Sequence, residues 1–252
     1  MGITETFDNT TEEILKPSHM TKRVEGFPEI VVVTFSKKVL DALIKNRNPE
    51  IISKAHAGIE IPVYKIEFNG KAIAVYLTWL GGPATVGLLE EMIIKGGKKI
   101  LLFGSAGSLD KNITDGHIIV PVSAYRDEGT SYHYVPAEEG DFIDIKTADK
   151  LVGIFSEIGI PVITGKTWTT DAIYRETQKN KKLRKAAGCI TVEMECASVM
   201  AMAKFRKVEA FQFLYTADNL DSDEWEPRLL GNMPQDIIEK HARIVLEAAV
   251  RI

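Results

Sequence analysis

Residues 191–197, Thr-Val-Glu-Met-Glu-Cys-Ala, mark a point where a strand-like pattern changes into a helix-like one. If the segment begins extended, Glu193 and Glu195 point to one side of the strand. Two neighbouring anions raise each other's pKa unless hydrogen-bond donors meet them. The hydroxyls of a sugar are such donors, and the thioether of Met194 suits the apolar sugar face. This pattern predicts a ribose clamp; alternatively, both glutamates favour a helix N-terminus, where the macrodipole attracts negative charge.

Strand-like and helix-like patterns alternate on both sides of this segment, which is typical of an α/β protein. An Asn-Gly pair at 69–70 separates two β-rich runs and predicts a hairpin, so the sheet should be mixed. We expect a polar N-terminal segment at 1–29 and, at 30–252, one α/β domain with a mixed central β-sheet flanked by helices. The expected strands are 30–35, 61–68, 71–77, 99–103, 117–120, 162–166 and 210–216, and the expected helices are 39–46, 84–95, 148–158, 197–207 and 235–252.

Composition narrows the class of partner and the compartment. The chain has 252 residues, 45% hydrophobic content and a net charge of −4, which suits one domain without the basic face that nucleic acids require. No charged-then-apolar leader and no bilayer-length apolar run is present, so we expect a cytoplasmic protein without a membrane partner. The two cysteines, Cys189 and Cys196, have no further cysteine or histidine at metal-ligand spacing, and no metal site is expected.

Two glycine-rich stretches follow strand-like runs, at 81–85 (Gly-Gly-Pro-Ala-Thr) and at 104–108 (Gly-Ser-Ala-Gly-Ser). Backbone amides can converge on an anion in such turns, with Thr85 and Ser105 as added donors. The alternative is a tight strand-to-helix turn. Neither stretch has the glycine spacing of a P-loop or of a dinucleotide fingerprint.

Asp218 ends the apolar strand-like run at 210–217. A carboxyl at this place is partly removed from water, which raises its pKa and lets it donate a proton to a leaving group. The alternative is an Asp-Asn turn that closes the strand. Upstream, the segment 167–177 mixes hydroxyls with aromatic rings; Tyr174 or Trp168 could stack on a flat base, and Asp171 could cap the helix that follows.

Together these pieces resemble the nucleoside phosphorylase and nucleosidase family, which includes purine nucleoside phosphorylase, uridine phosphorylase and methylthioadenosine nucleosidase. The resemblance runs from residue 30 to the C-terminus and is carried, in order, by Gly-Gly-Pro at 81–83, Gly-Ser-Ala-Gly at 104–107, Thr-Thr-Asp-Ala at 169–172, Val-Glu-Met-Glu at 192–195, and Asp218. It implies a nucleoside phosphorylase-like fold and a pentosyltransferase active in purine salvage.

The resemblance also implies roles for individual residues. Met194 and Glu195 would contact the ribose with support from Glu193, and Asp218 would protonate a purine at N7. The base would lie against Ala106, Gly107, Tyr174 and Trp168. A single pocket would then have the 194–195 corner and Asp218 at its opposite ends.

The phosphate site departs from the pattern of the phosphorylases. Leu102 stands where an arginine is expected before the glycine turn, and Ile59 stands near the place of an arginine that a neighbouring subunit supplies. Lys38 could replace a third arginine as a point charge without the bidentate fork. The expected phosphate contacts are therefore Lys38, Thr85, Gly104 and Ser105. The methylthioadenosine nucleosidases also lack these arginines and use water.

We expect a nucleoside phosphorylase for a purine-type base, with phosphate as co-substrate and no other cofactor. The alternatives are a nucleosidase that uses water, a uridine phosphorylase, and a non-catalytic nucleoside-binding protein. Members of this family form dimers or trimers of dimers, so the resemblance implies a homodimer or a homohexamer.

Overall fold

A computed structural model describes residues 2–56, 58–113, 115–222 and 224–252. Its centre is a ten-stranded sheet in the order β10-β6-β8-β9-β5-β1-β4-β3-β2, with β7 paired to β6. The strands are β1 Ile30–Thr34, β2 Glu50–His56, β3 Glu60–Phe68, β4 Lys71–Leu77, β5 Lys99–Ser108, β6 Ile118–Asp127, β7 Phe142–Asp144, β8 Val162–Thr170, β9 Cys189–Glu193 and β10 Glu209–Asn219.

The sheet is mixed, as predicted. Strands β4, β1, β5 and β10 run parallel to one another, and β3 runs antiparallel to β4. The predicted hairpin joins these two strands, with Phe68 opposite Lys71 and positive φ angles of 48° at Asn69 and 76° at Gly70. These angles are what a two-residue turn of the primed type requires, which explains why Asn-Gly fits there.

Five of the strands close on themselves. Strand β5 pairs with β9 and also with β10, and the path β10-β6-β8-β9 returns to β5. Strands β1, β4, β3 and β2 extend outward from β5. Closure brings the end of β9 beside the ends of β5 and β10, although β9 runs antiparallel to β5.

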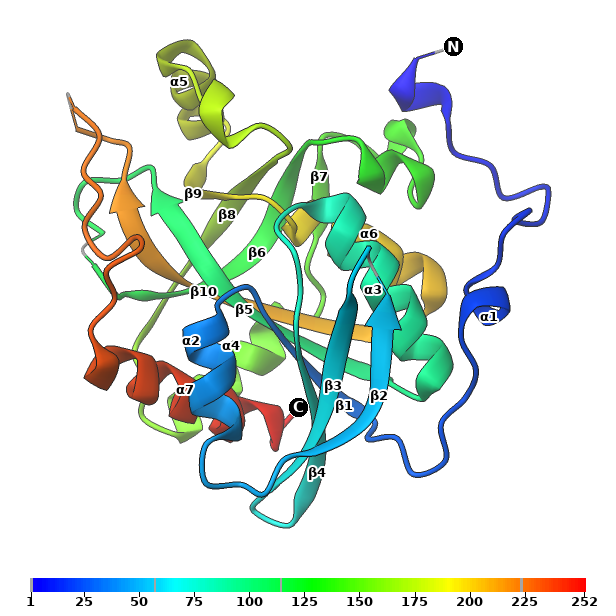
Figure 1. Ribbon diagram of the computed structural model, residues 1–252. Helices are drawn as coiled ribbons and strands as arrows, with labels where there is room; N and C mark the ends of the chain where they lie inside the picture. Colours follow the sequence, from blue (N-terminus) through cyan, green and yellow to red (C-terminus); the bar gives the residue numbers. More distant parts are fainter. Residues whose placement is uncertain (1, 57, 114, 223) are drawn as a thin grey trace.

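Helices cover both sides of the sheet. In Figure 1, α2 and α7 lie together on one side and α3 and α6 on the other, while α5 stands apart at the top of the view. The α-helices are α1 Pro17–Met20, α2 Lys37–Ile44, α3 Gly82–Lys95, α4 Ala148–Glu157, α5 Gln178–Ala186, α6 Cys196–Arg206 and α7 Gln235–Ala249. Short 3-10 helices are η1 Ile3–Glu5, η2 Thr130–His133, η3 Ala137–Glu139 and η4 Ile173–Arg175.

The predicted fold class is confirmed, and the main differences lie in element lengths. Strands β5, β6 and β8 continue well past their predicted ends, and β2, β7 and α5 were not predicted. Helix α5 buries no residue, so its sequence has no apolar stripe to reveal it. Within the described residues, no helix is long and apolar enough to cross a membrane.

The N-terminal segment lies along the side of the molecule formed by α3 and α6 (Figure 1). Apart from η1 and α1 it has no regular structure. Glu13 pairs with Arg206 of α6 at 2.9 Å, and Phe27 is buried against the core. An ion pair and an apolar contact therefore attach this segment to the rest of the chain.

The core contains one buried histidine, and we expect it to make stability depend on pH. His241 of α7 is 3% exposed and packs against the rings of Phe103 and Tyr215, with centroid distances of 5.3 and 4.9 Å. Burial lowers the pKa of His241 to about 4. Between about pH 4 and 6.5 the unfolded chain therefore binds a proton at this histidine that the folded chain does not bind. The neutral, buried histidine therefore contributes to the free energy of unfolding in full above the ordinary histidine pKa of about 6.5. This contribution, on the order of 2–3 kcal/mol, is lost as the pH falls towards about 4.

Urea unfolding of the wild type and of His241→Phe at about pH 7 and pH 4.5 measures this effect. We expect the variant to lose less stability on acidification, by about the stated amount. The control His56→Gln removes a histidine whose side chain is 61% exposed and should follow the wild type. Equal acid sensitivity of His241→Phe and the wild type would contradict the prediction.

Candidate active site

Strand β9 ends at Glu193, whose carboxylate holds the β9–α6 corner together. It accepts hydrogen bonds from Thr169 Oγ1 at 2.6 Å and from the backbone amides of Glu195 at 2.8 Å and Cys196 at 2.7 Å. Burial raises the pKa of Glu193, and these three donors oppose that rise. Its contact with the first amide of α6 agrees with the helix N-terminus interpretation. Glu193 thereby fixes the backbone on which Glu195 stands.

Glu195 joins this corner to the start of α3. Its Oε1 accepts a hydrogen bond of 2.6 Å from the Gly81 amide, and the side chain is buried. Helices α3 and α6 approach each other closely here: a Cβ at Gly82 would lie only 2.2 Å from Ser198 Oγ. Burial raises the pKa of Glu195, and the nearby Glu193 carboxylate raises it further. Met194, between the two glutamates, is half-buried.

Asp218 lies near the end of β10 and faces a cavity of about 340 Å³. Its Oδ2 accepts a hydrogen bond of 2.8 Å from Trp225 Nε1. Burial raises the pKa of Asp218, whereas the Trp225 hydrogen bond and the charge of Arg228 oppose the rise. A carboxyl in this setting can hold a proton and donate it, as the sequence predicts for Asp218. The cavity is lined by Tyr174, Glu176, Gln178, Lys181, Asp218, Leu220, Ser222 and Trp225.

Gly107 separates Asp218 from β9. Asp218 pairs with Gly107 across β10 and β5, and Gly107 pairs with Val192 across β5 and β9. Asp218 and Val192 are therefore two strand spacings apart, a total of roughly 10 Å. A Cβ at Gly107 would lie 3.3 Å from Asp218 Oδ1. Gly107 therefore adjoins Asp218 and also Leu220, which a Cβ would approach to 2.4 Å, whereas Ala106 is buried in an apolar cluster; base contacts at both stay a prediction.

The structure does not place the predicted ribose and base ends in one cavity. Among the described residues, those that line the cavity at Asp218 do not include Glu193, Met194 or Glu195. The Glu195 side chain instead lies in the interior, where its carboxylate accepts a hydrogen bond from the Gly81 amide. In this conformation the predicted ribose and base ends are therefore not joined in one cavity, and the single pocket stays a prediction.

The two aromatic residues predicted to contact the base have opposite surroundings. Trp168 is 1% exposed, packs with Leu109 and Val192 and donates from Nε1 to Asp127 Oδ2 at 2.9 Å. Its ring is core and offers no face to a base, so this prediction is wrong. Tyr174 is exposed and lines the cavity at Asp218, where a base could reach it.

Asp171 does not cap the helix that follows it. Its Oδ2 instead accepts a hydrogen bond of 2.9 Å from the Gly129 amide. The residue that caps α5 is Thr177, whose side chain accepts from the Asn180 amide. The capping prediction for Asp171 is therefore wrong, and this carboxylate joins two loops.

The stretch 104–108 is part of β5 and forms no anion-binding turn. A Cβ at Gly104 would lie 2.9 Å from the ring of Phe35, so the glycine makes room for an aromatic side chain. Ser105 pairs with Tyr215 in β10, and their side chains share a hydrogen bond. The predicted turn is therefore wrong, because these residues are extended in β5, whereas phosphate contacts at Gly104 and Ser105 stay a prediction.

The other two predicted phosphate contacts, Thr85 and Lys38, lie in the helices that follow β4 and β1. Thr85 in α3 is fully buried, and its hydroxyl donates to the Trp79 carbonyl at 3.1 Å; as a phosphate donor it is therefore a wrong prediction for this structure. Lys38 is exposed in the first turn of α2. Leu102, at the place of the expected arginine, is completely buried.

Two residues beside Asp218 were not predicted from the sequence. Glu176 follows η4 and lines the cavity with Asp218, and Trp225 supplies the indole donor. The signal for Glu176 was a carboxylate within the 167–177 segment, beside Tyr174. Trp225 is brought back by a bridge between Asn219 and Glu226, which the sequence pattern does not reveal.

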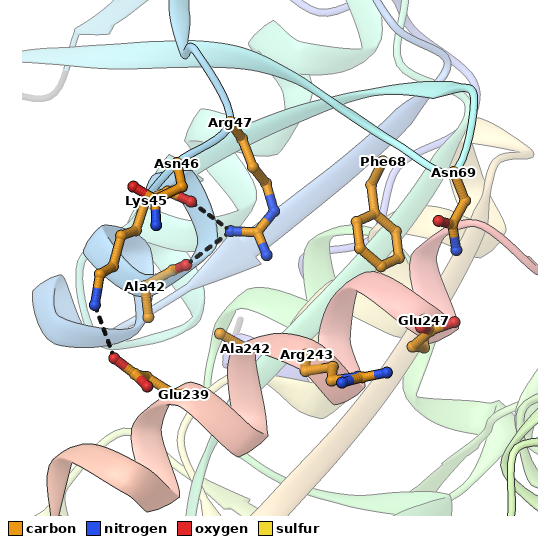
Figure 2. Close-up of a pocket in the computed structure, with 10 residues that line it drawn as sticks. All are labelled: Ala42, Lys45, Asn46, Arg47, Phe68, Asn69, Glu239, Ala242, Arg243 and Glu247. Carbon is orange, nitrogen blue, oxygen red and sulfur yellow. Dashed lines mark hydrogen bonds and ion pairs between the residues drawn. The ribbon is translucent and has the colours of Figure 1, made fainter.

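A second cavity, of about 520 Å³, lies away from these residues between α2, α7 and the β3–β4 hairpin (Figure 2). Arg47 donates there to the carbonyls of Ala42, Leu43 and Lys45 at the end of α2, and Lys45 pairs with Glu239 at 2.9 Å. Arg47 thereby satisfies the last carbonyls of α2, and the Lys45–Glu239 pair joins the end of α2 to α7. No predicted site residue lines this cavity.

The fold and the site define an α/β protein with buried carboxyls at the ends of its central strands. A family model described as the phosphorylase superfamily matches residues 29–251, and the chain belongs to this family. The uridine phosphorylase of Salmonella typhimurium is 26% identical over 81% of this chain and 89% of that protein. A DeoD-type purine nucleoside phosphorylase of Exiguobacterium is 26% identical over 73% and 78%. A guanosine phosphorylase of Halorubrum lacusprofundi is 25% identical over 77% and 82%.

The resemblance found in the sequence is thereby confirmed. The relatives are named as nucleoside phosphorylases, which are pentosyltransferases, and the chain is an enzyme of this class. Their names include both pyrimidine and purine nucleosides.

Proposed function

We propose that this enzyme cleaves the N-ribosyl bond of a purine-type nucleoside with inorganic phosphate as the nucleophile. The observation that carries the proposal is Asp218, a largely buried carboxyl that faces a cavity and is held by Trp225. A purine leaves with negative charge on its ring and needs a proton at N7. A carboxyl whose pKa is raised by burial can supply that proton.

In this mechanism the bond between the ribose and the base breaks as the sugar gains oxocarbenium character. The proton of Asp218 passes to the base, and phosphate forms the new bond to the sugar carbon. In its ionised form, Glu195 favours the developing positive charge on the ribose. Because Glu195 is buried against Gly81, the loop at the start of α3 has to shift when the sugar binds. Glu193 acts by fixing the Glu195 backbone.

Water is the second candidate nucleophile, and a specific observation favours it. Leu102 is buried where an arginine is expected, and the hydroxyl of Thr85 already donates to a carbonyl. Phosphate would then depend on Lys38 and on backbone amides. A nucleosidase needs no such anion site.

A substrate panel separates these functions. We expect purified enzyme to release base from purine nucleosides and to form ribose 1-phosphate only when phosphate is added. Release of free ribose at an unchanged rate in phosphate-free buffer would identify a nucleosidase. A preference for uridine would identify a uridine phosphorylase, and tight binding without product would identify a nucleoside-binding protein.

We also propose a homo-oligomer, a dimer or a hexamer, in the cytoplasm. Its support is a group of exposed apolar residues beside the start of β3: Ile59, Trp79 and Leu80 are 56%, 48% and 66% exposed. A second copy would cover this apolar surface. Sedimentation of the wild type and of Leu80→Asp measures whether this surface joins copies.

A further inference from the structure

Trp225 binds the carboxyl of Asp218 although it is itself largely exposed. At 59% exposure its N–H group could donate to water, yet Nε1 donates to Asp218 Oδ2 at 2.8 Å. The ring also lines the cavity that Asp218 faces. The hydrogen bond therefore matters more to the acceptor than to the donor, because the buried carboxyl is the group that has lost most of its contact with water.

A short antiparallel bridge carries Trp225 back to Asp218. The backbones of Asn219 and Glu226 exchange two hydrogen bonds, of 3.0 and 3.2 Å, and Asn219 Nδ2 donates to Glu226 Oε2 at 3.0 Å. Arg228 Nε donates to the same carboxylate oxygen at 3.0 Å. The two bridged residues directly follow Asp218 and Trp225 in the sequence, so the bridge brings these two side chains together.

The direction of this hydrogen bond determines which oxygen of Asp218 can carry a proton. An indole N–H only donates, whereas a neutral carboxyl has one hydroxyl that donates and one carbonyl oxygen that is the stronger acceptor. Since Oδ2 accepts from Trp225, the proton of the neutral form lies on Oδ1. A Cβ at Gly107 would lie 3.3 Å from this oxygen and 2.4 Å from Leu220 Cδ1. Oδ1 and the Leu220 side chain therefore lie beside the bare backbone of Gly107 in β5.

We propose that Trp225 is a positioning residue for the proton of Asp218: by donating to Oδ2 it keeps the proton on Oδ1, from which the departing base takes it. This inference rests on the proposed function, in which Asp218 is the acid. As the base leaves, the O–H bond at Oδ1 breaks, an N–H bond forms on the base, and the negative charge that developed on the base passes to the carboxylate. The hydrogen bond from Trp225 then has a charged acceptor and becomes stronger, so it favours the transfer.

The same hydrogen bond gives the direction of a pH effect. A donor to the charged form lowers the pKa of an acid, and the Trp225 hydrogen bond opposes the rise that burial causes in the pKa of Asp218. The other titratable groups around Asp218 are those of Tyr174, Glu176, Lys181, Tyr215 and Arg228. A variant without the indole donor leaves these groups unchanged, so its Asp218 has a higher pKa and stays protonated to higher pH.

Trp225→Phe removes the donor and keeps an aromatic ring in the cavity wall. We expect its kcat on purine nucleosides to fall about tenfold below neutral pH, the effect of losing one hydrogen bond to a charged group. The basic limb of the kcat profile should move up by about one pH unit, so that variant and wild type converge at high pH. KM should stay within about twofold. A riboside whose leaving group is a stable anion needs no proton and should keep its wild-type kcat.

Two outcomes would overturn the inference. A kcat that falls equally at every pH and with both leaving groups would give Trp225 a general structural role, and a change in KM alone would make it a base contact. The control Glu224→Gln removes an exposed carboxylate next to Trp225 and should keep the wild-type profile.

Indole fluorescence tests the contact without turnover. We expect the contribution of Trp225, measured as the difference between wild type and Trp225→Phe, to change as Asp218 titrates, and this transition should be missing from Asp218→Asn. A transition that persists in Asp218→Asn, or none in the wild type, would show that the indole does not respond to this carboxyl. The proposed function fails separately: if Asp218→Asn keeps wild-type activity, Asp218 is not the acid. If Asp218→Asn is inactive and Trp225→Phe keeps the wild-type kcat and basic limb, only the role of Trp225 is wrong.

Discussion

Replacing Asp218 with asparagine is expected to lower kcat on purine nucleosides by about 10²–10⁴-fold, the usual contribution of a positioned proton donor. The amide has no acidic proton to give to the leaving base. Its oxygen can still accept the Trp225 hydrogen bond that Asp218 Oδ2 accepts now. The fold and the cavity should therefore survive the change.

The leaving group supplies the sharpest measurement of this effect. A riboside whose leaving group is a stable anion, such as a nitrophenolate, needs no proton, and we expect it to lose far less rate in Asp218→Asn. Thermal unfolding should be nearly unchanged. An equal loss on both substrates would show that the substitution damages the site in general, and full activity on purine nucleosides would remove Asp218 from the mechanism.

The sequence predicted the fold correctly where the conformation favoured by neighbouring residues is also the one that the folded chain adopts. The Asn69-Gly70 turn requires two positive φ angles, and the structure has both. The Val-Glu-Met-Glu block predicted a change from strand to helix, and β9 does end at Glu193 with α6 beginning at Cys196. In both places a few neighbouring residues determine the backbone.

The errors lie where a distant contact determines the conformation. Gly104 looks like part of a turn, yet pairing with β10 keeps it extended, and its missing side chain makes room for Phe35. Trp168 lies among hydroxyl residues that suggest a binding wall, yet its ring packs into the core. A strand pattern separates the two faces of a strand, but it does not say which face meets a ligand.

The same distinction between local and distant contacts explains why only part of the candidate site could be predicted. Asp218 was found because it follows a long apolar strand, and that strand alone implies its partial burial. Glu176 was not found, because only the fold brings it to the cavity that Asp218 also lines. The contact between Glu195 and Gly81 likewise joins two segments 114 positions apart.

That contact gives Glu195 two separable roles, and a pair of variants distinguishes them. Glu195→Gln keeps an oxygen that can accept from the Gly81 amide but removes the anion. If the carboxylate binds a ribose hydroxyl, the loss of one charged hydrogen bond is about 1.5–3 kcal/mol, or roughly 10–150-fold in kcat/KM. Stability should change little.

Glu195→Ala removes the acceptor as well. The Gly81 amide then loses its partner, which costs about 1–3 kcal/mol of stability if it stays buried, and kcat/KM should fall at least as far as in Glu195→Gln. A 2′-deoxyribonucleoside lacks one hydroxyl of the cis-diol, so its kcat/KM should fall less in Glu195→Gln than that of the ribonucleoside. If Glu195→Gln keeps wild-type kcat/KM on both sugars while Glu195→Ala only unfolds more easily, the carboxylate serves to hold the start of α3 and the ribose clamp is wrong.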